Sequence, residues 1–319
     1  MHKIGIVGHT GMVGQEIQKV LYKHDSVEIV YKKNSTLQEG NLNECELIFL
    51  ATKDLESMNF SKTALENGIK VIDMSGAYRL PLEAFEKWYG LKHLFPGYIG
   101  EAVYGMPAFN FEKIAGARLV ANPGCYPTSV ILALRPLKGL ISQENICIVS
   151  TSGNSGARRE CDEIDDDVTY SYGRKHKHVP EMEIYSGFKV DFTPIVLRSI
   201  LKGINTNIRA ELADDLKNIG EEAAKQAIEN ALKQAYCEDD RIFVVSDSED
   251  KVYGTKDVND THDMIIKVRV DEGKVYINTL IDNLMKGAAS QGVENMNIML
   301  GVPRLKGIVK CHHERKRRI

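Results

Sequence analysis

The chain has few of the features that mark membrane, nucleic-acid-binding or disulfide-rich proteins. Its 319 residues contain no apolar run near the ~20 residues that a membrane-spanning helix needs. The 41 Lys and Arg residues are offset by 44 Asp and Glu, and the formal net charge of -3 gives no reason to expect a nucleic acid or a membrane surface as partner. We therefore expect a globular protein with a small-molecule substrate.

The cysteines lack the spacing of a zinc site or a disulfide framework. They contain no CxxC pair and lie at Cys45, Cys125, Cys147, Cys161, Cys237 and Cys311. No metal is expected, and a chain of this length does not need disulfides for stability. No charged-then-apolar leader precedes the first apolar run, "KIGIVG". The sequence predicts an unprocessed, soluble protein of the reducing cytoplasm.

What the sequence does contain is a change of pattern between its halves. In the first half, "KIGIVG", "VEIVY", "LIFLAT" and "KVIDMS" alternate with helical patterns at Met12–Tyr22 and near Ser61–Asn67, which predicts βαβ units and a parallel sheet. In the second half, "NICIVSTSG", "IFVVSD", "HDMIIKVRV" and "KVYINTLID" predict strands, and Ala210–Tyr236 has the periodicity of one amphipathic helix. The second half is therefore expected to be an α+β domain with a largely antiparallel sheet.

These patterns predict an α/β protein of two domains. Residues 1–125 with 286–319 are expected to form a Rossmann-like dinucleotide-binding domain, because a helix at about 286–300 would pack back on the first half. Residues 126–285 are expected to form the catalytic, substrate and oligomerisation domain.

Three glycines lie in the turn between the first strand and the first helix. Glycine there lets the backbone approach a pyrophosphate, whose charge the N–H groups and dipole of the helix N-terminus stabilise. A glycine that merely permits tight packing of the turn is the alternative. The residues predicted to contact a dinucleotide at this turn are Gly8, Thr10, Gly11, Met12, Val13 and Gly14.

The end of the second strand favours NADP(H) over NAD(H). An NAD site usually has an acidic residue about 20 positions after the glycines to bind the ribose 2′-hydroxyl. Here the strand "VEIVY" is followed by Lys32, Lys33, Asn34 and Ser35, which suit a 2′-phosphate. A solvated lysine pair is the alternative.

Cys125 precedes an apolar run instead of lying within it, where a structural cysteine is usually found. Pro127 favours a helix start, which would put the Cys125 sulfur at the positive end of a helix, where a thiolate is stabilised. Lowering a thiol pKa from about 8.5 to about 6.5 takes about 2.7 kcal/mol. A helix dipole supplies only about 0.3–1 kcal/mol. A second cation near the sulfur is therefore expected.

The segment "YGRKHKHVPEMEI" offers that cation. His176 and His178 stand two residues apart, so both would project to one face of an extended segment, and Glu181 could hold one imidazole in a single tautomer. A metal site and a pair of surface histidines without a role are the alternatives; no third or fourth ligand at a suitable spacing supports the metal.

The motifs together resemble the N-acetyl-γ-glutamyl-phosphate reductase family, in the larger group of aspartate-semialdehyde and glyceraldehyde-3-phosphate dehydrogenases. The shorter of the two family types is the better match. The resemblance runs in family order along nearly the whole chain, through the glycine-rich turn, "VIDMSGAYRL", "YGMP", "VANPGCYPT", "STSGNSGARR", "KHKHVPEM", "DFTP" and "DNLMKGAASQGVENMNIMLG".

The resemblance implies an NADPH-dependent reduction of N-acetyl-L-glutamyl 5-phosphate to the 5-semialdehyde and phosphate, in arginine biosynthesis, through a cysteine thioester. Cys125 matches the nucleophile, His178 the acid/base and Glu181 the residue that orients it. A homodimer or homotetramer is also implied. Further residues implied to lie near the cofactor are Ser75, Ser152, Gly153, Asn283 and Lys286.

The substrate phosphate requires cations and N–H donors. The candidates are Arg79, Asn122, Arg159 and His176, with a structural role as the alternative for Arg79. Two other functions remain open: reduction of a related acyl phosphate, either aspartyl phosphate or carrier-protein-bound aminoadipyl phosphate, and NADP sensing without catalysis.

Overall fold

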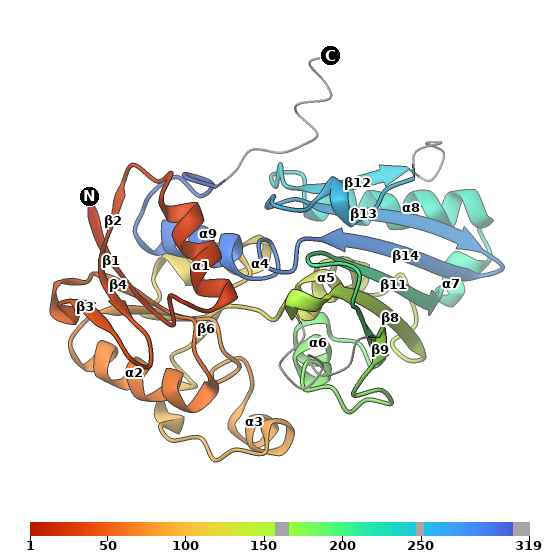
Figure 1. Cartoon of the computed structure of the whole chain (residues 1–319). Coiled ribbons are helices and arrows are strands. Elements are labelled where there is room, and N and C mark those ends of the chain that lie inside the picture. Colours follow the sequence, from red (N-terminus) through yellow and green to blue (C-terminus); the bar gives the residue numbers. More distant parts are fainter. Residues whose placement is uncertain (157–165, 247–251, 309–319) are drawn as a thin grey trace. The chain divides into compact units, whose positions relative to one another are not determined.

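The computed structural model describes residues 1–156, 166–246 and 252–308 (Figure 1). These residues form two compact units. One contains Met1–Gly124 and the described residues from Gly287 onward, and the other contains Cys125–Lys286. The second unit is thus inserted between two parts of the first. Each unit is built on one sheet, and the expected combination of a Rossmann-like and an α+β fold is confirmed.

The first unit has a sheet in the order β3-β2-β1-β4-β5-β7-β6. All neighbours are parallel except β2 and β3, which pair antiparallel. The strands are β1 (His2–Val7), β2 (Val27–Lys33), β3 (Gln38–Gly40), β4 (Leu47–Leu50), β5 (Lys70–Asp73), β6 (Val103–Tyr104) and β7 (Leu119–Ala121). Because β2 and β4 lie on opposite sides of β1, the turn that follows β1 is at the point where the strand order reverses, which is where α/β sheets bind ligands.

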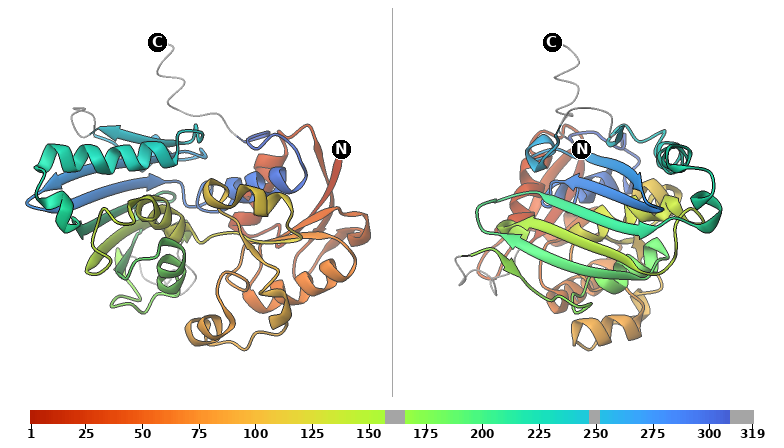
Figure 2. Two further views of the ribbon diagram at one scale, coloured as in Figure 1. Left: turned by 180° about the vertical axis from the view of Figure 1, so that it is seen from behind. Right: turned by 90° about the vertical axis from the view of Figure 1, so that its right-hand side faces the viewer.

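The helices of the first unit include one from the far end of the chain. They are α1 (Met12–Leu21), α2 (Asp54–Glu66), α3 (Leu82–Tyr89), α4 (Pro107–Ala115) and α9 (Ala289–Met299). Helix α9 packs against α1 and α4, so the expected return of the C-terminal helix to the first half of the chain is confirmed (Figure 2). All eleven residues of α9 are buried, as a helix enclosed by its neighbours requires.

The second unit has a mixed sheet in the order β12-β13-β14-β11-β8-β10-β9. Its pairs are antiparallel except β12 with β13 and β8 with β10. The strands are β8 (Ile146–Gly153), β9 (Val168–Thr169), β10 (Val190–Leu197), β11 (Ile204–Glu211), β12 (Ile242–Ser246), β13 (Met264–Asp271) and β14 (Lys274–Ile281). The helices are α5 (Cys125–Leu134), α6 (Val179–Ser186), α7 (Asp214–Lys217) and α8 (Glu221–Ala235).

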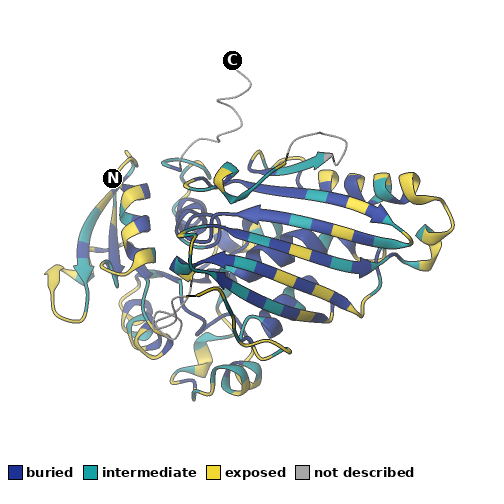
Figure 3. Cartoon of the chain, turned by 45° about the vertical axis from the view of Figure 1, so that its right-hand side comes forward, coloured by how far each residue is buried: buried dark blue, intermediate teal, exposed yellow. Residues whose placement is uncertain are grey.

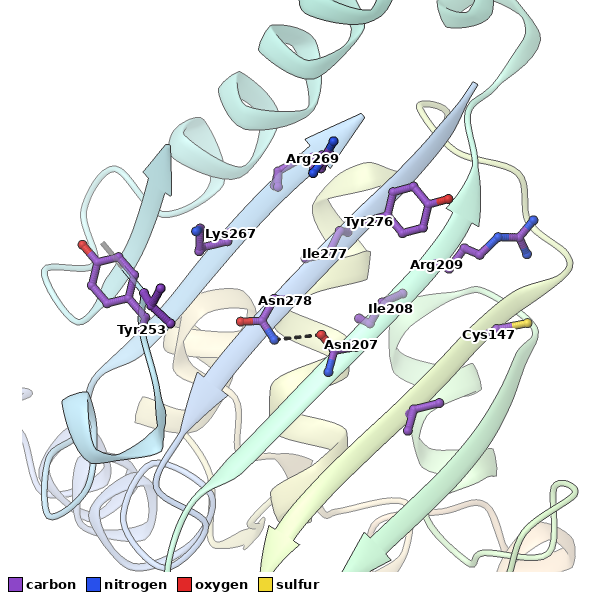
Figure 4. A pocket seen from close by; sticks show the side chains of 13 residues that line it. Cys147, Asn207, Ile208, Arg209, Tyr253, Lys267, Arg269, Tyr276, Ile277 and Asn278 are labelled. Atoms are coloured by element: carbon purple, nitrogen blue, oxygen red, sulfur yellow. Dashed lines mark hydrogen bonds between the residues drawn. The ribbon is translucent and has the colours of Figure 1, made fainter. Parts of the chain in front are cut away.

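One face of this sheet is covered and the other is open. Buried residues alternate with exposed or half-buried ones along β8, β10 and β11 (Figure 3). Helices α5, α6 and α8 pack on the buried face. On the open face, side chains of β8, β11, β13 and β14, with Val252 and Tyr253, line a shallow hollow of about 560 Å³ (Figure 4).

The single helix expected at Ala210–Tyr236 is wrong over residues 210–220. Ala210 belongs to β11, and Gly220, with a φ of 87°, separates the short helix α7 from α8. The amphipathic periodicity holds only for Glu221–Ala235. The strands β10 and β11 were also not expected from the sequence.

Candidate active site

Cys125 is the first residue of helix α5. Its side chain is partly exposed, whereas all nine residues that follow it in the helix are buried. The predicted helix start is thus confirmed. A thiol in the first turn lies at the end of the helix where unpaired N–H groups and the dipole favour negative charge.

Hydroxyl groups fix α5 to the sheet beneath it. The Ser129 hydroxyl donates to the carbonyl oxygen of Tyr126 and lies 2.9 Å from the hydroxyl of Thr206 on β11. Thr206 in turn lies 2.6 Å from the Ser150 hydroxyl on β8. All three hydroxyl residues are fully buried, so their bonds are shielded from water. The helix that carries Cys125 is therefore a rigid mount.

His178 is the N-cap residue of α6, and Glu181 lies in the first turn of that helix. Glu181 is fully buried and His178 is half-buried. The loop before α6 is fixed by Arg174, a non-glycine residue with a φ of 65°. The Arg174 guanidinium lies 2.8 Å from the Glu183 carboxylate and donates to the carbonyl oxygen of Val190.

The ring of Tyr126 brings the cysteine motif and the histidine motif together. Its centroid lies 5.7 Å from that of His176 and 6.0 Å from that of His178, both in edge-to-face geometry. The ring centroid of Phe192 on β10 lies 5.1 Å from the centroid of the Tyr126 ring. Burial raises the pKa of Tyr126 well above its usual value, so the phenol stays protonated. The residue next to Cys125 thus contacts both imidazoles.

Three aromatic residues around the two imidazoles were not predicted as part of the site: Tyr126, Tyr170 and Phe192. The Tyr170 hydroxyl lies 3.3 Å from Nε2 of His176. Phe192 lies 5.4 Å from the same ring, measured between centroids. The "DFTP" motif contains Phe192 and is the one signal that could have located it. No spacing in the sequence marks Tyr170.

The residues predicted near the cofactor in the second unit lie at the end of β8 and after β14. The Asn283 amide donates to the Ser155 hydroxyl at 3.0 Å and accepts from the Gly203 N–H at 2.7 Å. A Cβ on Gly153 would come within 2.5 Å of the Leu201 backbone, so glycine is required there for packing. Ser152 is buried, with its hydroxyl 3.0 Å from the Gly153 carbonyl oxygen.

Lys286 is also buried in the second unit. Its ammonium lies 3.1 Å from Nε2 of His262, whose side chain is fully buried. Nearby, burial raises the pKa of Asp282, while hydrogen bonds from the backbone N–H groups of Asp260 and Leu284 oppose that shift. The segment from Asp282 to Lys286 is therefore held by buried polar contacts.

In the first unit, the glycine-rich turn has the close packing that a dinucleotide turn needs. Gly8 has a φ of 84°, and a Cβ there would lie 2.2 Å from the Ala51 carbonyl oxygen. A Cβ on Gly14 would lie 2.3 Å from the Gly8 carbonyl oxygen. Gly11 is the N-cap of α1 and has room for a side chain. No side chain caps this N-terminus among the described residues, so its N–H groups can receive an anion.

The two lysines at the end of β2 have different surroundings. The Lys32 ammonium lies 3.3 Å from the Glu39 carboxylate, and the Lys33 ammonium donates to the Gln38 side chain at 3.3 Å. The carbonyl oxygen of Lys33 accepts the Gly8 N–H at 2.7 Å, so Lys33 adjoins the glycine-rich turn. Consecutive strand residues point to opposite faces of a sheet.

Arg79 and Asn122 are buried and hydrogen-bonded within the first unit. Arg79 donates from Nε to the Asn122 carbonyl oxygen at 2.7 Å and from Nη2 to the Met74 carbonyl oxygen at 2.8 Å. The Asn122 side chain accepts from Asn295 at 3.0 Å. These bonds support the structural alternative for Arg79, because they join the turns after β5 and β7.

Ser75 follows β5 in the same unit. It donates to the Asp73 carboxylate at 2.9 Å, and burial raises the pKa of Asp73. Arg159, the remaining phosphate candidate, lies outside the described residues.

Comparisons with known proteins agree with this division. Residues 31–117 match the semialdehyde dehydrogenase NAD binding domain, and residues 125–283 match the semialdehyde dehydrogenase dimerisation domain. The first match begins after the glycine-rich turn. The second begins at Cys125, the residue at which the second compact unit begins.

Curated relatives and solved structures match over nearly the whole chain. N-acetyl-gamma-glutamyl-phosphate reductase of Thiobacillus denitrificans is 32% identical over 95% of this chain and 96% of the relative, and that of Campylobacter hominis is 33% identical over 97% and 98%. An aspartate semialdehyde dehydrogenase II structure from Vibrio cholerae has a TM-score of 0.71 at 18% identity, covering 94% and 98% of the two chains, which shows the fold. The chain therefore belongs to the N-acetyl-γ-glutamyl-phosphate reductase family, with the fold of the semialdehyde dehydrogenases.

Proposed function

We propose that the protein reduces N-acetyl-L-glutamyl 5-phosphate to N-acetyl-L-glutamate 5-semialdehyde and phosphate, with NADPH as reductant, in arginine biosynthesis. The observation that carries this proposal is the contact of the Tyr126 ring with both His176 and His178. It joins the nucleophile motif to the acid/base motif within one unit. The names of the curated relatives support the substrate.

In this mechanism the Cys125 thiolate attacks the acyl phosphate carbonyl, and phosphate leaves with the bonding electron pair. A thioester on Cys125 remains, so that one difficult step becomes two easier ones. His178 donates a proton to the oxygen of the thiohemiacetal that then forms on Cys125, and takes it back as the C–S bond breaks to give the aldehyde and the Cys125 thiolate. Glu181, buried in the first turn of α6, orients the His178 ring.

The first unit fits a dinucleotide, because Gly8 and Gly14 leave a cradle that a Cβ would fill. The Gly8–Gly14 turn and the N-terminus of α1 would hold the pyrophosphate, and Lys33 or Lys32 the 2′-phosphate. When bound, the reduced nicotinamide supplies a hydride for the thioester carbon. Ser152, Gly153, Asn283 and Lys286 are proposed to line the site on the second unit.

The reverse reaction is the sharpest test of this function. Purified protein with N-acetylglutamate semialdehyde, NADP⁺ and inorganic phosphate should produce NADPH, and omission of phosphate should abolish the signal. Aspartate semialdehyde and a carrier-protein-bound aminoadipate semialdehyde, assayed alongside, decide between the acyl groups. The proposal would be overturned if NADP⁺ were reduced without phosphate, or if none of the three aldehydes led to NADPH. Binding of the cofactor without turnover would favour an NADP sensor.

The cofactor preference gives a prediction for the two lysines. Replacing Lys32 and Lys33 together by glutamate should raise the KM for NADPH by about 10- to 100-fold, the scale of a lost charge-assisted hydrogen bond. The KM for NADH should change little, because NADH has no 2′-phosphate. The single variants Lys32→Glu and Lys33→Glu identify the lysine involved, since neighbours on a strand face opposite ways.

Two control variants sharpen this experiment. Glu39→Gln removes the ion-pair partner of Lys32 and should leave the KM for NADPH unchanged or lower it. Lys23→Glu places the charge change of one single variant at an exposed position of the same unit and should alter neither KM. Equal effects of the double variant on NADPH and NADH would remove the 2′-phosphate interpretation.

We further propose that a second copy of the chain covers the open face of the sheet in the second unit. Val149 and Tyr276 expose 42% and 39% of their surface there, and the dimerisation-domain match includes both. The double variant Val149→Asp with Tyr276→Asp should therefore halve the mass measured by light scattering after gel filtration. Tyr22→Asp, at an exposed site of the first unit, should not. An unchanged mass of the double variant would exclude this face.

None of the helices in the described part of the chain is both long and apolar enough to span a bilayer. A location in the cytoplasm is part of the proposal, in keeping with a biosynthetic reduction.

A further inference from the structure

The two nitrogens of His176 have different partners. The backbone N–H of His178 points to Nδ1 of His176 at 3.1 Å, and the Tyr170 hydroxyl lies 3.3 Å from Nε2. The side chain is buried, at 7% exposure. The ring is also packed by Tyr126, Phe192 and His178, so its orientation is fixed on several sides.

These partners determine the protonation state of the ring. A backbone N–H can only donate, so Nδ1 of His176 must carry a lone pair. A neutral imidazole then has its proton on Nε2, which donates to the Tyr170 hydroxyl. Protonation of Nδ1 would break the bond from the His178 N–H and leave two N–H groups facing each other in a buried place.

The same pair of hydrogen bonds occurs at His93, where the partners allow only the tautomer with the proton on Nε2. The Phe95 N–H donates to Nδ1 of His93 at 3.2 Å, and Nε2 lies 3.0 Å from the Ala77 carbonyl oxygen, which can only accept. Burial lowers the pKa of His93, in keeping with a ring held neutral. In this motif the Nδ1 of a histidine accepts the backbone N–H of the residue two positions later in the chain. At His93 the motif is structural.

We propose that His176 is a permanently neutral positioning residue, which holds the backbone of His178 through Nδ1 and Tyr170 through Nε2. It is not a cation for the substrate phosphate. The centroids of His176 and His178 lie 4.6 Å apart, so two protonated rings would repel each other. A neutral His176 leaves His178 as the ring of this pair that exchanges protons. The kinetic part rests on the proposed function, whereas the tautomer does not.

Two amide variants separate the nitrogens of His176. In His176→Asn the side-chain oxygen takes the place of Nδ1 and can still accept the His178 N–H. In His176→Gln the amide reaches the place of Nε2 and loses that acceptor. We expect His176→Gln to lower kcat at least about 10-fold more than His176→Asn, the scale of one lost buried hydrogen bond. The substrate KM should change little in both variants.

Nitrogen-15 NMR of histidine-labelled full-length protein tests the tautomer without any assay of activity. The His176 signals, identified by their loss in His176→Asn, should keep the pattern of a neutral ring with the proton on Nε2 from pH 8 to pH 5. Tyr170→Phe should alter the Nε2 signal and leave Nδ1 unprotonated.

The outcomes are distinct. A ring that becomes doubly protonated near the ordinary histidine pKa overturns the assignment. Equal kcat losses in the two amide variants, or losses confined to the KM for the acyl phosphate, also overturn it and favour a role as phosphate ligand. If the protein reduces none of the candidate substrates, the proposed function fails, while the NMR result still decides the tautomer.

Discussion

Replacing Cys125 by serine is expected to lower turnover on the order of 10⁴-fold or more, the scale of losing a covalent nucleophile. A serine hydroxyl in the first turn of α5 is far less ionised than a thiol, and an oxygen ester accepts hydride less readily than a thioester. Binding of NADPH should be unchanged, because its predicted contacts lie elsewhere. The measurement is the reverse assay together with a fluorescence titration of NADPH. Retained reductase activity in this variant would exclude the covalent step.

Alkylation rates give an independent check on the same sulfur. Iodoacetamide at pH 7, followed by peptide mass spectrometry, should modify Cys125 faster than the exposed Cys147 and Cys237. Cys45 serves as the slow reference, because burial raises its pKa to about 11. If Cys125 reacted no faster than Cys147, the helix terminus and the imidazole would not be activating it.

Replacing His178 by asparagine is expected to lower kcat by ~10²–10⁴-fold, as the loss of a general acid/base does. Asparagine keeps a polar side chain at the N-cap of α6, so the fold should be retained and the melting temperature should change little. Steady-state rates between pH 5 and 9 are the measurement. The pH dependence that reports this imidazole should disappear in the variant.

The neighbouring histidine provides the control for that experiment. If His178→Asn lost little activity and His176→Asn lost much, proton transfer would belong to His176. That result would contradict both the acid/base assignment and the neutral tautomer of His176. A loss in His178→Asn accompanied by a large fall in melting temperature would instead point to the contact with the Tyr126 ring as its main role.

The short strands β6 and β7 and the exposed, polar β3 of the first unit were not expected, but β1, β2, β4 and β5 could be predicted from the sequence because each contains a short apolar run. Such runs are typical of parallel strands buried on both faces. The second unit was harder, because its open sheet face replaces apolar residues with polar ones. Strand β11 reads "INTNIRAE", with Asn205 and Asn207 on the open side, and β10 contains Pro194, which normally argues against an inner strand. The neighbouring strand β9 is short and ends at Thr169, opposite Ile195. Pro194 therefore lies beyond the paired residues, where the missing N–H of proline breaks no hydrogen bond between β10 and β9.

The sequence predicted which motifs contribute to the candidate site, but not which side chains of those motifs contact one another. Cys125 and His178 could be named from their motifs, but the contact that unites them runs through Tyr126, whose role no spacing encodes. His176 was named as a candidate phosphate ligand because phosphate requires cations. The neutral ring proposed above rests on the bond from the His178 N–H, which no spacing in the sequence encodes. The tautomer of a histidine depends on its hydrogen-bond partners, and these are set by the path of the backbone around the ring.

The insertion of the second unit into the first has a consequence for synthesis. On the ribosome, all residues of Cys125–Lys286 emerge before α9, which α1 and α4 need as a packing partner. The unit that contains Cys125 can therefore fold while the first unit still lacks α9. Helix α9 is added last, so a nascent chain can expose the folded helix that carries Cys125 before its first unit is complete.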